Sequence, residues 1–327
     1  METINFLTPE VSQADLVTFS EERVNLKQPD AQRYRKQVSD LREDLERYMA
    51  EHPDFGVEKM LLSGSLAKGT ALKTIRDADV AVYVKGGSAP QELAALVQWL
   101  ATKLRLTYPQ IDPQKITVDG PCVVIAFSGT GIKVEITPVY SLGDAEGRGY
   151  LWDRSTGKKV LTSIPRHLEF TRKRKDKQPT HYAQVIRLLK WWVRQREKDT
   201  LDFKFRSFLV ELIVAKVADN GADFSDYHVG IEKVFSYIQN TGLKERIAFS
   251  DYYKATSLPK TRMGVVEIFD PVNPENNVAA DVTESTRMQL VTLASTALDH
   301  LSYARTCQTK GEALECWRDV MGSSFSA

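Results

Sequence analysis

The segment that decides the fold is residues 61–83, LLSGSLAKGTALKTIRDADVAVY. It begins with an apolar pair and a Gly-Ser turn at Gly64 and Ser65, and it ends with Asp77 and Asp79 at the start of an apolar strand. Because side chains two positions apart in a strand point to the same face, the two carboxylates lie side by side. Like charges that close repel each other and raise one pKa unless a cation lies between them. The segment therefore predicts a divalent-cation site next to a turn that can bind phosphate.

The simpler interpretation of Asp77 and Asp79 is an aspartate-rich strand end in a turn, which is what an isolated Asp-x-Asp usually is. The Gly-Ser turn upstream and an apolar strand on each side favour a catalytic site instead. A pair of Mg²⁺ ions, or Mn²⁺ in their place, would hold the attacking and leaving oxygens of an in-line phosphoryl displacement.

The composition is that of an ordinary globular chain of more than one domain's length. The chain has 327 residues, of which 42% are hydrophobic. Lys+Arg and Asp+Glu nearly cancel at 44 and 43, whereas constitutive nucleic-acid binding more often needs a basic excess. Three cysteines without C-x-x-C spacing argue against disulfides and a thiolate zinc site. With no membrane-spanning apolar run and no signal pattern, the protein is expected in the cytoplasm, away from membranes.

Apolar periodicity divides the chain into two halves and predicts an α+β fold. Residues 1–160 are expected to form a mixed β-sheet catalytic lobe, and residues 161–327 a helical lobe. In the first half we predict helices over 30–50 and 90–107, with Pro90 in the first turn, and strands over 59–62, 79–84, 116–118, 122–127 and 132–136. Residues 143–159 are expected to be a glycine-rich connector. In the second half we predict helices over 181–198, 205–219, 229–240 and 284–305.

The segment 61–83 resembles the nucleotidyltransferase signature of oligoadenylate synthases and cGAS/DncV-like enzymes. Further similar blocks follow in the same order at 132–140, 183–192, 205–212 and 268–278, so the resemblance covers most of the chain. It is strongest to bacterial CD-NTases of the D clade, from CBASS anti-phage systems. It implies a two-lobed, polymerase-beta-like fold with the nucleotide in the cleft between the lobes.

The resemblance also implies roles for individual residues. The third metal-binding acid would be Glu135, where the family usually has Asp, and alternation along its strand places it on the polar face. The residues expected to bind the nucleotide are Gly64, Ser65, Lys68, Lys190, Ser207, Phe208 and Asn277. From the sequence alone, Lys190 is equally a lysine whose stem crosses an apolar stripe. Phe208 lies on an apolar helix where most aromatics belong to the core, but Ser207 beside it, seventeen residues after Lys190, favours base stacking.

A protein of this kind would be an Mg²⁺-dependent nucleotidyltransferase that makes a cyclic di- or trinucleotide, rich in adenine, from ATP and other NTPs. A downstream effector would respond to the product. Two alternatives remain: a transferase that adds nucleotides to an RNA end or a small-molecule hydroxyl, and a non-catalytic nucleotide-sensing module. The basic run at 172–177 is interpreted as a solvated helix end in preference to an RNA site.

The last eight residues, VMGSSFSA at 320–327, are predicted to be a flexible tail. The resemblance implies regulation by a partner, of the ubiquitin-transfer-like or HORMA type. We hypothesise that Ala327 is a conjugation site. Deletion of residues 325–327 would then leave catalysis intact.

Overall fold

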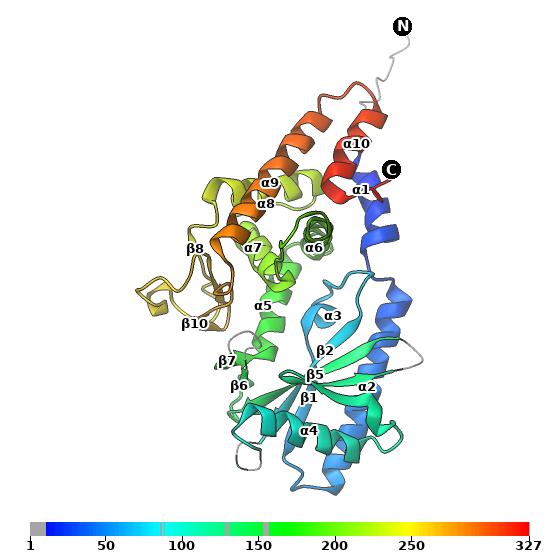
Figure 1. Ribbon diagram of the computed structural model, residues 1–327, viewed down its shortest axis with the longest axis vertical. Coiled ribbons are helices and arrows are strands. Elements are labelled where there is room, and N and C mark those ends of the chain that lie inside the picture. The colour runs from blue at the N-terminus through cyan, green and yellow to red at the C-terminus, as the bar shows by residue number, and fades with distance from the viewer. Residues whose placement is uncertain (1–10, 86, 88, 128–130, 153–156, 327) are drawn as a thin grey trace.

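The computed structural model describes residues 11–85, 87, 89–127, 131–152 and 157–326. In Figure 1 the β-sheet lies in the lower part of the molecule and most of the helices lie above it. This is the α+β architecture expected from the periodicity, with a mixed sheet in one lobe and helices in the other.

The lower lobe is built on a sheet with the strand order β1-β2-β5-β4-β3, extended where β6 pairs with both β5 and β7. Only β2 and β5 run parallel among the paired strands described in this sheet. The strands are β1 (Val57–Leu62), β2 (Asp77–Val84), β3 (Ile116–Asp119), β4 (Cys122–Ala126), β5 (Lys133–Ser141), β6 (Arg148–Trp152) and β7 (Lys159–Ser163).

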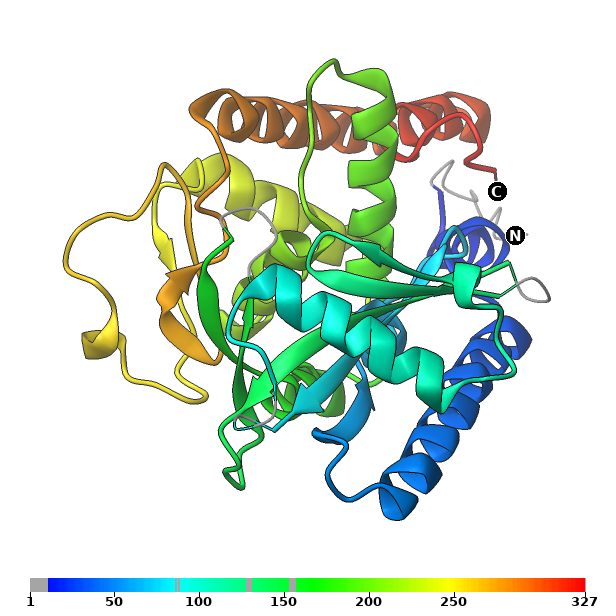
Figure 2. The ribbon, with the colours of Figure 1, turned by 60° about the horizontal axis from the view of Figure 1, so that its bottom comes forward.

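The two faces of this sheet differ because β2 and β5 alternate apolar and polar residues. One face is apolar and is covered by α2 (Gln28–Glu51) and α4 (Leu93–Thr107), as Figure 2 shows. Its core contains the buried side chains of Leu45, Val80, Leu100, Val134 and Ile136. The other face carries Asp77, Asp79 and Glu135 and turns toward the helical lobe. The polar side chains of the sheet are therefore left for a site between the lobes.

The helical lobe consists of α5 (Ile164–Lys177), α6 (His181–Asp199), α7 (Ser207–Asp219), α8 (Tyr227–Thr241), α9 (Glu284–Ala304) and α10 (Lys310–Met321). Helices α6 and α7 are buried on most sides, because they run through the middle of the lobe. A small sheet with the order β10-β9-β8 lies at its side, formed by β8 (Arg246–Ile247), β9 (Glu267–Asp270) and β10 (Asn273–Asn277). None of the helices in the described ranges is long and apolar enough to cross a membrane.

The first elements of the chain belong to the helical lobe, although they precede the sheet in sequence. Helix α1 (Gln13–Phe19) is followed by one π-helical turn, η1 (Ser20–Val24). Leu16, Phe19 and Val24 are fully buried in the same apolar core as α6 to α10. The expected division at residue 160 therefore does not separate the two cores, because the N-terminal segment packs on the second one.

Two predictions for the sheet lobe are wrong. Residues 143–159 contain β6 and the start of β7, where a connector was expected. The glycines there suggested a loop, but a Cβ at Gly149 would lie 2.5 Å from Val139, so this glycine lets β6 approach β5. Helix α4 begins at Leu93 after its N-cap Glu92, so Pro90 lies outside its first turn.

The prediction of a flexible tail is also wrong as far as residue 325. Phe325 is 1% exposed, and its ring centroid lies 4.7 Å from that of Phe19 and 5.5 Å from that of Trp317. The backbone carbonyl of Phe325 also accepts a hydrogen bond from Arg318 Nε at 3.1 Å. A deletion from residue 325 would remove a core aromatic, so it does not isolate regulation from stability. Ala327 lies outside the described residues.

The basic run at 172–177 is not simply a solvated helix end. Arg174 is buried, and its guanidinium pairs with Asp251 at 2.9 Å and with Asp219. Lys173 pairs with Glu169 on the surface of the same helix at 3.2 Å. The most buried cation of the run therefore fixes α5 within its own lobe.

Candidate active site

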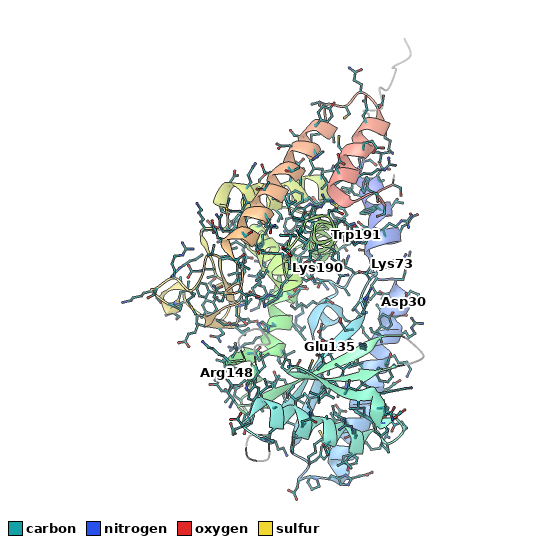
Figure 3. The ribbon with its side chains drawn as sticks, viewed as in Figure 1. Asp30, Lys73, Glu135, Arg148, Lys190 and Trp191 are labelled. Atoms are coloured by element: carbon teal, nitrogen blue, oxygen red, sulfur yellow. The ribbon has the colours of Figure 1, made fainter. Side chains whose placement is uncertain are left out.

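A cavity of about 1000 Å³ lies between the two lobes. This volume is at the upper end of the range for small-molecule sites. Figure 3 shows Lys190 and Trp191 on α6, above the sheet that carries Glu135. The lining includes eight of the ten residues predicted to form the site: Gly64, Ser65, Lys68, Asp77, Asp79, Lys190, Ser207 and Phe208.

The Gly-Ser segment forms a short helix, α3 (Gly64–Lys68), packed directly on the carboxylates. The amide of Ser63 donates to the backbone carbonyl of Asp79 at 2.8 Å. Gly64 has a φ of +60°, and a Cβ added there would lie 1.8 Å from Asp79 Oδ2. Only glycine fits this position, for both the backbone conformation and the space. The glycine of the sequence signature thus serves to bring the α3 backbone against an aspartate.

Asp77 and Asp79 both reach the cavity from the start of β2, and both are half-buried. The pKa of Asp79 is raised, first by burial and then by the negative charge of Asp77, although Lys68 and Lys190 act in the opposite direction. This is the effect that the sequence predicted for two neighbouring carboxylates. A divalent cation would relieve the repulsion, and carboxylate oxygens are its preferred ligands. The aspartate pair therefore fits a metal site.

Glu135 lies next to this pair but not in the lining of the cavity. The parallel register aligns Glu135 with Asp79, on the same face of the sheet. Among the described residues, no three His, Cys, Asp or Glu side chains lie close enough together to hold a metal ion. Two of the three predicted ligands are thus brought together, and the third is adjacent in register only.

The predicted phosphate-binding lysines share a buried carboxylate, Glu211 of α7. Lys68 Nζ donates to Glu211 Oε2 at 2.8 Å, and Lys190 Nζ donates to Glu211 Oε1. The hydroxyl of Thr70 also donates to Oε1, at 2.7 Å. Burial alone would raise the pKa of Glu211, but the charges of Lys68 and Lys190 outweigh burial and lower it to about 2. Burial lowers the pKa of Lys190, and Glu211 opposes that shift.

Glu211 was missed by the sequence reasoning. The signal was present, since it is the one charged residue in the apolar stretch FLVELIVA at 208–215. A charged side chain at a buried helix position requires a partner of opposite charge.

A second group lies at the α7 end of the cavity, around Phe208. Lys68 Nζ lies 4.6 Å from the centroid of the Phe208 ring. The ring of His167 packs against the same ring in an edge-on arrangement, with 5.9 Å between the two ring centroids. His167 Nε2 lies 2.6 Å from Asp270 Oδ1, and Asn276 Nδ2 donates to Asp270 Oδ2 at 3.2 Å. His167 and Asn276 both line the cavity, and no sequence motif had pointed to His167.

Asn277, which was expected to contact the nucleotide, is placed elsewhere. It is 5% exposed, and its Oδ1 accepts from the amides of Ile268 and Ala279, each at 3.0 Å. Its Nδ2 donates to the carbonyl of Val266 at 2.9 Å. Its amide therefore holds the β9–β10 segment together. Neighbouring residues in a strand point to opposite sides, so Asn276 reaches the cavity instead.

Another part of the cavity lining is basic, which the sequence reasoning did not predict. Five cations contribute to the lining there: Arg76, Arg194, Lys198, Lys204 and Arg206. Arg206 pairs with Asp281 at 2.5 Å. Burial lowers the pKa of Arg194, which is partly offset by the charges of Glu197 and Asp77. We refer to Arg76, Arg194, Lys198 and Lys204 as the basic rim.

Comparisons with known proteins identify the relatives of this chain. The family described as "Second Messenger Oligonucleotide or Dinucleotide Synthetase domain" matches residues 11–175. A cyclic AMP-AMP-AMP synthase of Escherichia coli (strain MS 115-1) is 42% identical over 97% of this chain and 99% of its own. The CBASS oligonucleotide cyclase CdnC of E. coli (strain KTE188) is 31% identical over 89% and 90% of the two chains.

Solved structures of CdnC are also similar to this chain. The structure of E. coli MS115-1 CdnC with ATP has a TM-score of 0.94 and that of its complex with HORMA-deltaN a TM-score of 0.93, both at 42% identity. Each match covers 97% of this chain and 99% of the other. The polymerase-beta-like fold is thereby confirmed. The D clade stays a prediction, since these relatives bear the name CdnC. This chain belongs to the CD-NTase family of CBASS systems, the nucleotidyltransferases that synthesise oligonucleotide second messengers.

Proposed function

We propose that this enzyme makes cyclic AMP-AMP-AMP from ATP. The observation that carries the proposal is the cavity in which Asp77 and Asp79 face Ser65 and Lys68. It combines a site for cations with groups that bind phosphate. The choice of product is supported by the 42% identity to a synthase named for that molecule, over nearly the whole of both chains.

We assign the metal site to Asp77 and Asp79, with Glu135 as the third acid. The metal is Mg²⁺, or Mn²⁺ in its place. Bound there, divalent ions would supply positive charge to the attacking and leaving oxygens of the transfer. The raised pKa of Asp79, caused first by burial and then by the charge of Asp77, supports this assignment, because a bound cation would stabilise the charged carboxylate.

The donor triphosphate is assigned to α3 and α7. The backbone amides and the hydroxyl around Gly64 and Ser65 can donate hydrogen bonds to an anion, and Lys68 and Ser207 line the same cavity. Lys190 also lines the cavity and adds positive charge at this end. Its ammonium is held in place by a contact with Thr70 Oγ1 at 3.1 Å. Holding the phosphates still is the main task in such transfers, since little protein acid–base chemistry is needed.

The donor base is assigned to the group around Phe208. The ring offers an apolar face for stacking, and the side chains of His167 and Asn276 lie on the same cavity. We assign the polar contact to Asn276 in place of Asn277, whose amide is already used by the backbone.

The basic rim is assigned to the 5′-triphosphate of the acceptor nucleotide and of the growing linear intermediate. Arg194 and Lys198 are four residues apart, so they share one face of α6. Charged donors of this kind bind phosphate oxygens strongly. A second phosphate region is required if the product of one transfer is to become the acceptor of the next.

The test is product analysis with purified protein. Radiolabelled ATP and Mg²⁺ should give a phosphatase-resistant product that co-migrates with synthetic cyclic AMP-AMP-AMP and has its mass. The matched control is Asp79→Asn, which removes one charge without changing size. A product that remains linear, or label transferred to added RNA, would contradict the proposal. The second result would favour the alternative function of adding nucleotides to an RNA end.

A HORMA-type partner is proposed for regulation, because a related CdnC forms a complex with HORMA-deltaN. Co-elution of the two purified proteins in size-exclusion chromatography would support it. A ubiquitin-transfer-like partner acting at Ala327 stays a prediction, as does the cytoplasmic location. Any conjugation at the C-terminus would take place two residues beyond the buried Phe325.

A further inference from the structure

We propose that Glu211 is a positioning residue, which links the two lobes and holds the ammonium group of Lys68 at the phosphate end of the cavity. The proposal rests on the assignment of Lys68 to the donor triphosphate. It goes beyond that assignment because Glu211 itself carries the wrong charge to bind a nucleotide.

The contacts of Glu211 cross the boundary between the lobes. Glu211 and Lys190 lie on α7 and α6 of the helical lobe. Lys68 and Thr70 follow the Gly-Ser segment in the sheet lobe, 143 and 141 positions away from Glu211 in sequence. A single carboxylate, with its side chain 8% exposed, therefore joins the two sides of the cleft.

The two lysines are held to different degrees. Lys190 has its side chain 3% exposed, and its ammonium reaches Glu211 Oε1, Thr70 Oγ1 at 3.1 Å and Thr70 O at 3.4 Å. These are as many acceptors as an ammonium has hydrogens. The side chain of Lys68 is 10% exposed, and among the described residues its hydrogen-bond acceptor is Glu211 Oε2. Lys68 therefore keeps donors for phosphate, and the rest of the cluster fixes its position.

The charges around the cluster explain why a carboxylate is needed. Lys190 is faced by Glu211 from α7, by Lys68 from α3 and by Asp79 from β2, and Arg194 follows it on its own helix. Without Glu211, two neighbouring cations would remain, one of them buried. A buried cation that has lost its partner is strongly unfavourable and tends to lose its proton.

The test is a double-mutant cycle on Glu211 and Lys68. We would measure kcat and KM for ATP consumption, together with Tm, in E211Q, K68M and the double variant. E211Q should lower kcat/KM by about a hundredfold, because the phosphate-binding group is no longer held in place. In the K68M background the same substitution should have little further effect. Equal losses from E211Q in both backgrounds would overturn the proposal.

A pH profile separates positioning from simple destabilisation. In E211Q the alkaline limb of kcat should move to lower pH, because Lys190 loses the carboxylate that opposes the loss of its proton. A loss of folded protein would lower activity to the same extent at every pH. An alkaline limb unchanged from wild type, with reduced kcat, would therefore contradict the proposal.

E211D provides a second variant if E211Q does not fold. Its charge remains next to Lys190, so Tm should stay close to that of wild type, but the shorter side chain cannot reach both lysines. We expect reduced kcat/KM in the folded variant, and wild-type kcat/KM would overturn the proposal. ATP consumption is the readout throughout, so a product other than cyclic AMP-AMP-AMP would refute the proposed function and leave the Glu211 test valid.

Discussion

The two proposed phosphate regions of the cavity contain similar cations in very different surroundings. At the α3 end, Lys68 and Lys190 are nearly buried and share Glu211. At the basic rim, Arg76, Lys198 and Lys204 are exposed. A buried, paired cation has a fixed position and low conformational freedom, whereas an exposed lysine must be ordered by its ligand. The comparison suggests that the α3 end is prepared for a donor that must be held in one geometry, and that the rim accepts chains of different length.

The largest effect is expected from Asp79, a carboxylate of the proposed metal site. Asp79→Asn should abolish ATP consumption, because one charge of the predicted metal site is lost. The fold should survive, and Tm should rise, since burial and Asp77 disfavour the charge of Asp79 in the folded state. Activity assays and thermal melting without metal measure the two effects. Substantial product from a folded variant would contradict the assignment.

Gly64→Ala, at the α3 end of the cavity, should be the next most damaging change. The new Cβ would overlap with the carboxylate of Asp79, and the positive φ would add strain. We expect kcat to fall by about a hundredfold, since α3 must shift relative to the aspartates. Gly157→Ala, also at positive φ, is the control for backbone strain, because among the described residues no atom beyond its chain neighbours lies within 4 Å of the new Cβ. Equal losses in both variants would argue against the close approach as the cause.

Acid stability should distinguish the buried cluster from the exposed rim. The pKa of Glu211 is about 2 in the folded protein, against an ordinary value of 4.5, so its stabilising charge is present above pH 4.5. That stabilisation is lost as pH falls toward 2. Wild type should exceed E211Q by about 3 kcal/mol in free energy of unfolding at pH 7. Denaturant melts between pH 7 and pH 2 should show this difference in the free energy of unfolding narrowing only below about pH 4.5.

The smallest effect is expected at the basic rim. The double substitution Lys198→Gln/Lys204→Gln should raise KM for ATP by roughly tenfold with little change in Tm, because these side chains are exposed. The effect should shrink at high salt, which screens exposed charges. Lys173→Gln, at an exposed ion pair away from the cavity lining, is the matched control. A rise in KM that is independent of salt would contradict a role as an exposed phosphate site.

Much of the fold and part of the site follow from local patterns. The alternation in residues 77–84 and 132–136 predicts which face of the sheet is polar, and the helical periodicity gave α6 and α9 to within a residue at each end. Gly64, Asp77 and Asp79 could be identified because a short segment contains the whole motif. Local sequence carries this information because the direction of a side chain depends on the period of its own strand or helix.

Other features depend on contacts between distant parts of the chain. Asn276 rather than Asn277 reaches the cavity because the β9–β10 backbone uses the amide of Asn277. Phe325 is buried because α1, from the other end of the sequence, packs beside α10. Gly149 allows a strand to pair closely, where glycine-rich sequence indicated a loop.

The sequence by itself determined the chemistry of this protein: two carboxylates beside a glycine turn, in an α+β chain of two lobes. The tertiary structure decided how that chemistry is held in place. Glu211 meets Lys68 and Thr70 only because the helical lobe closes over the sheet across more than 140 positions. Periodicity specifies which residues are buried, but the pairing of buried charges is fixed by the packing of one lobe against the other.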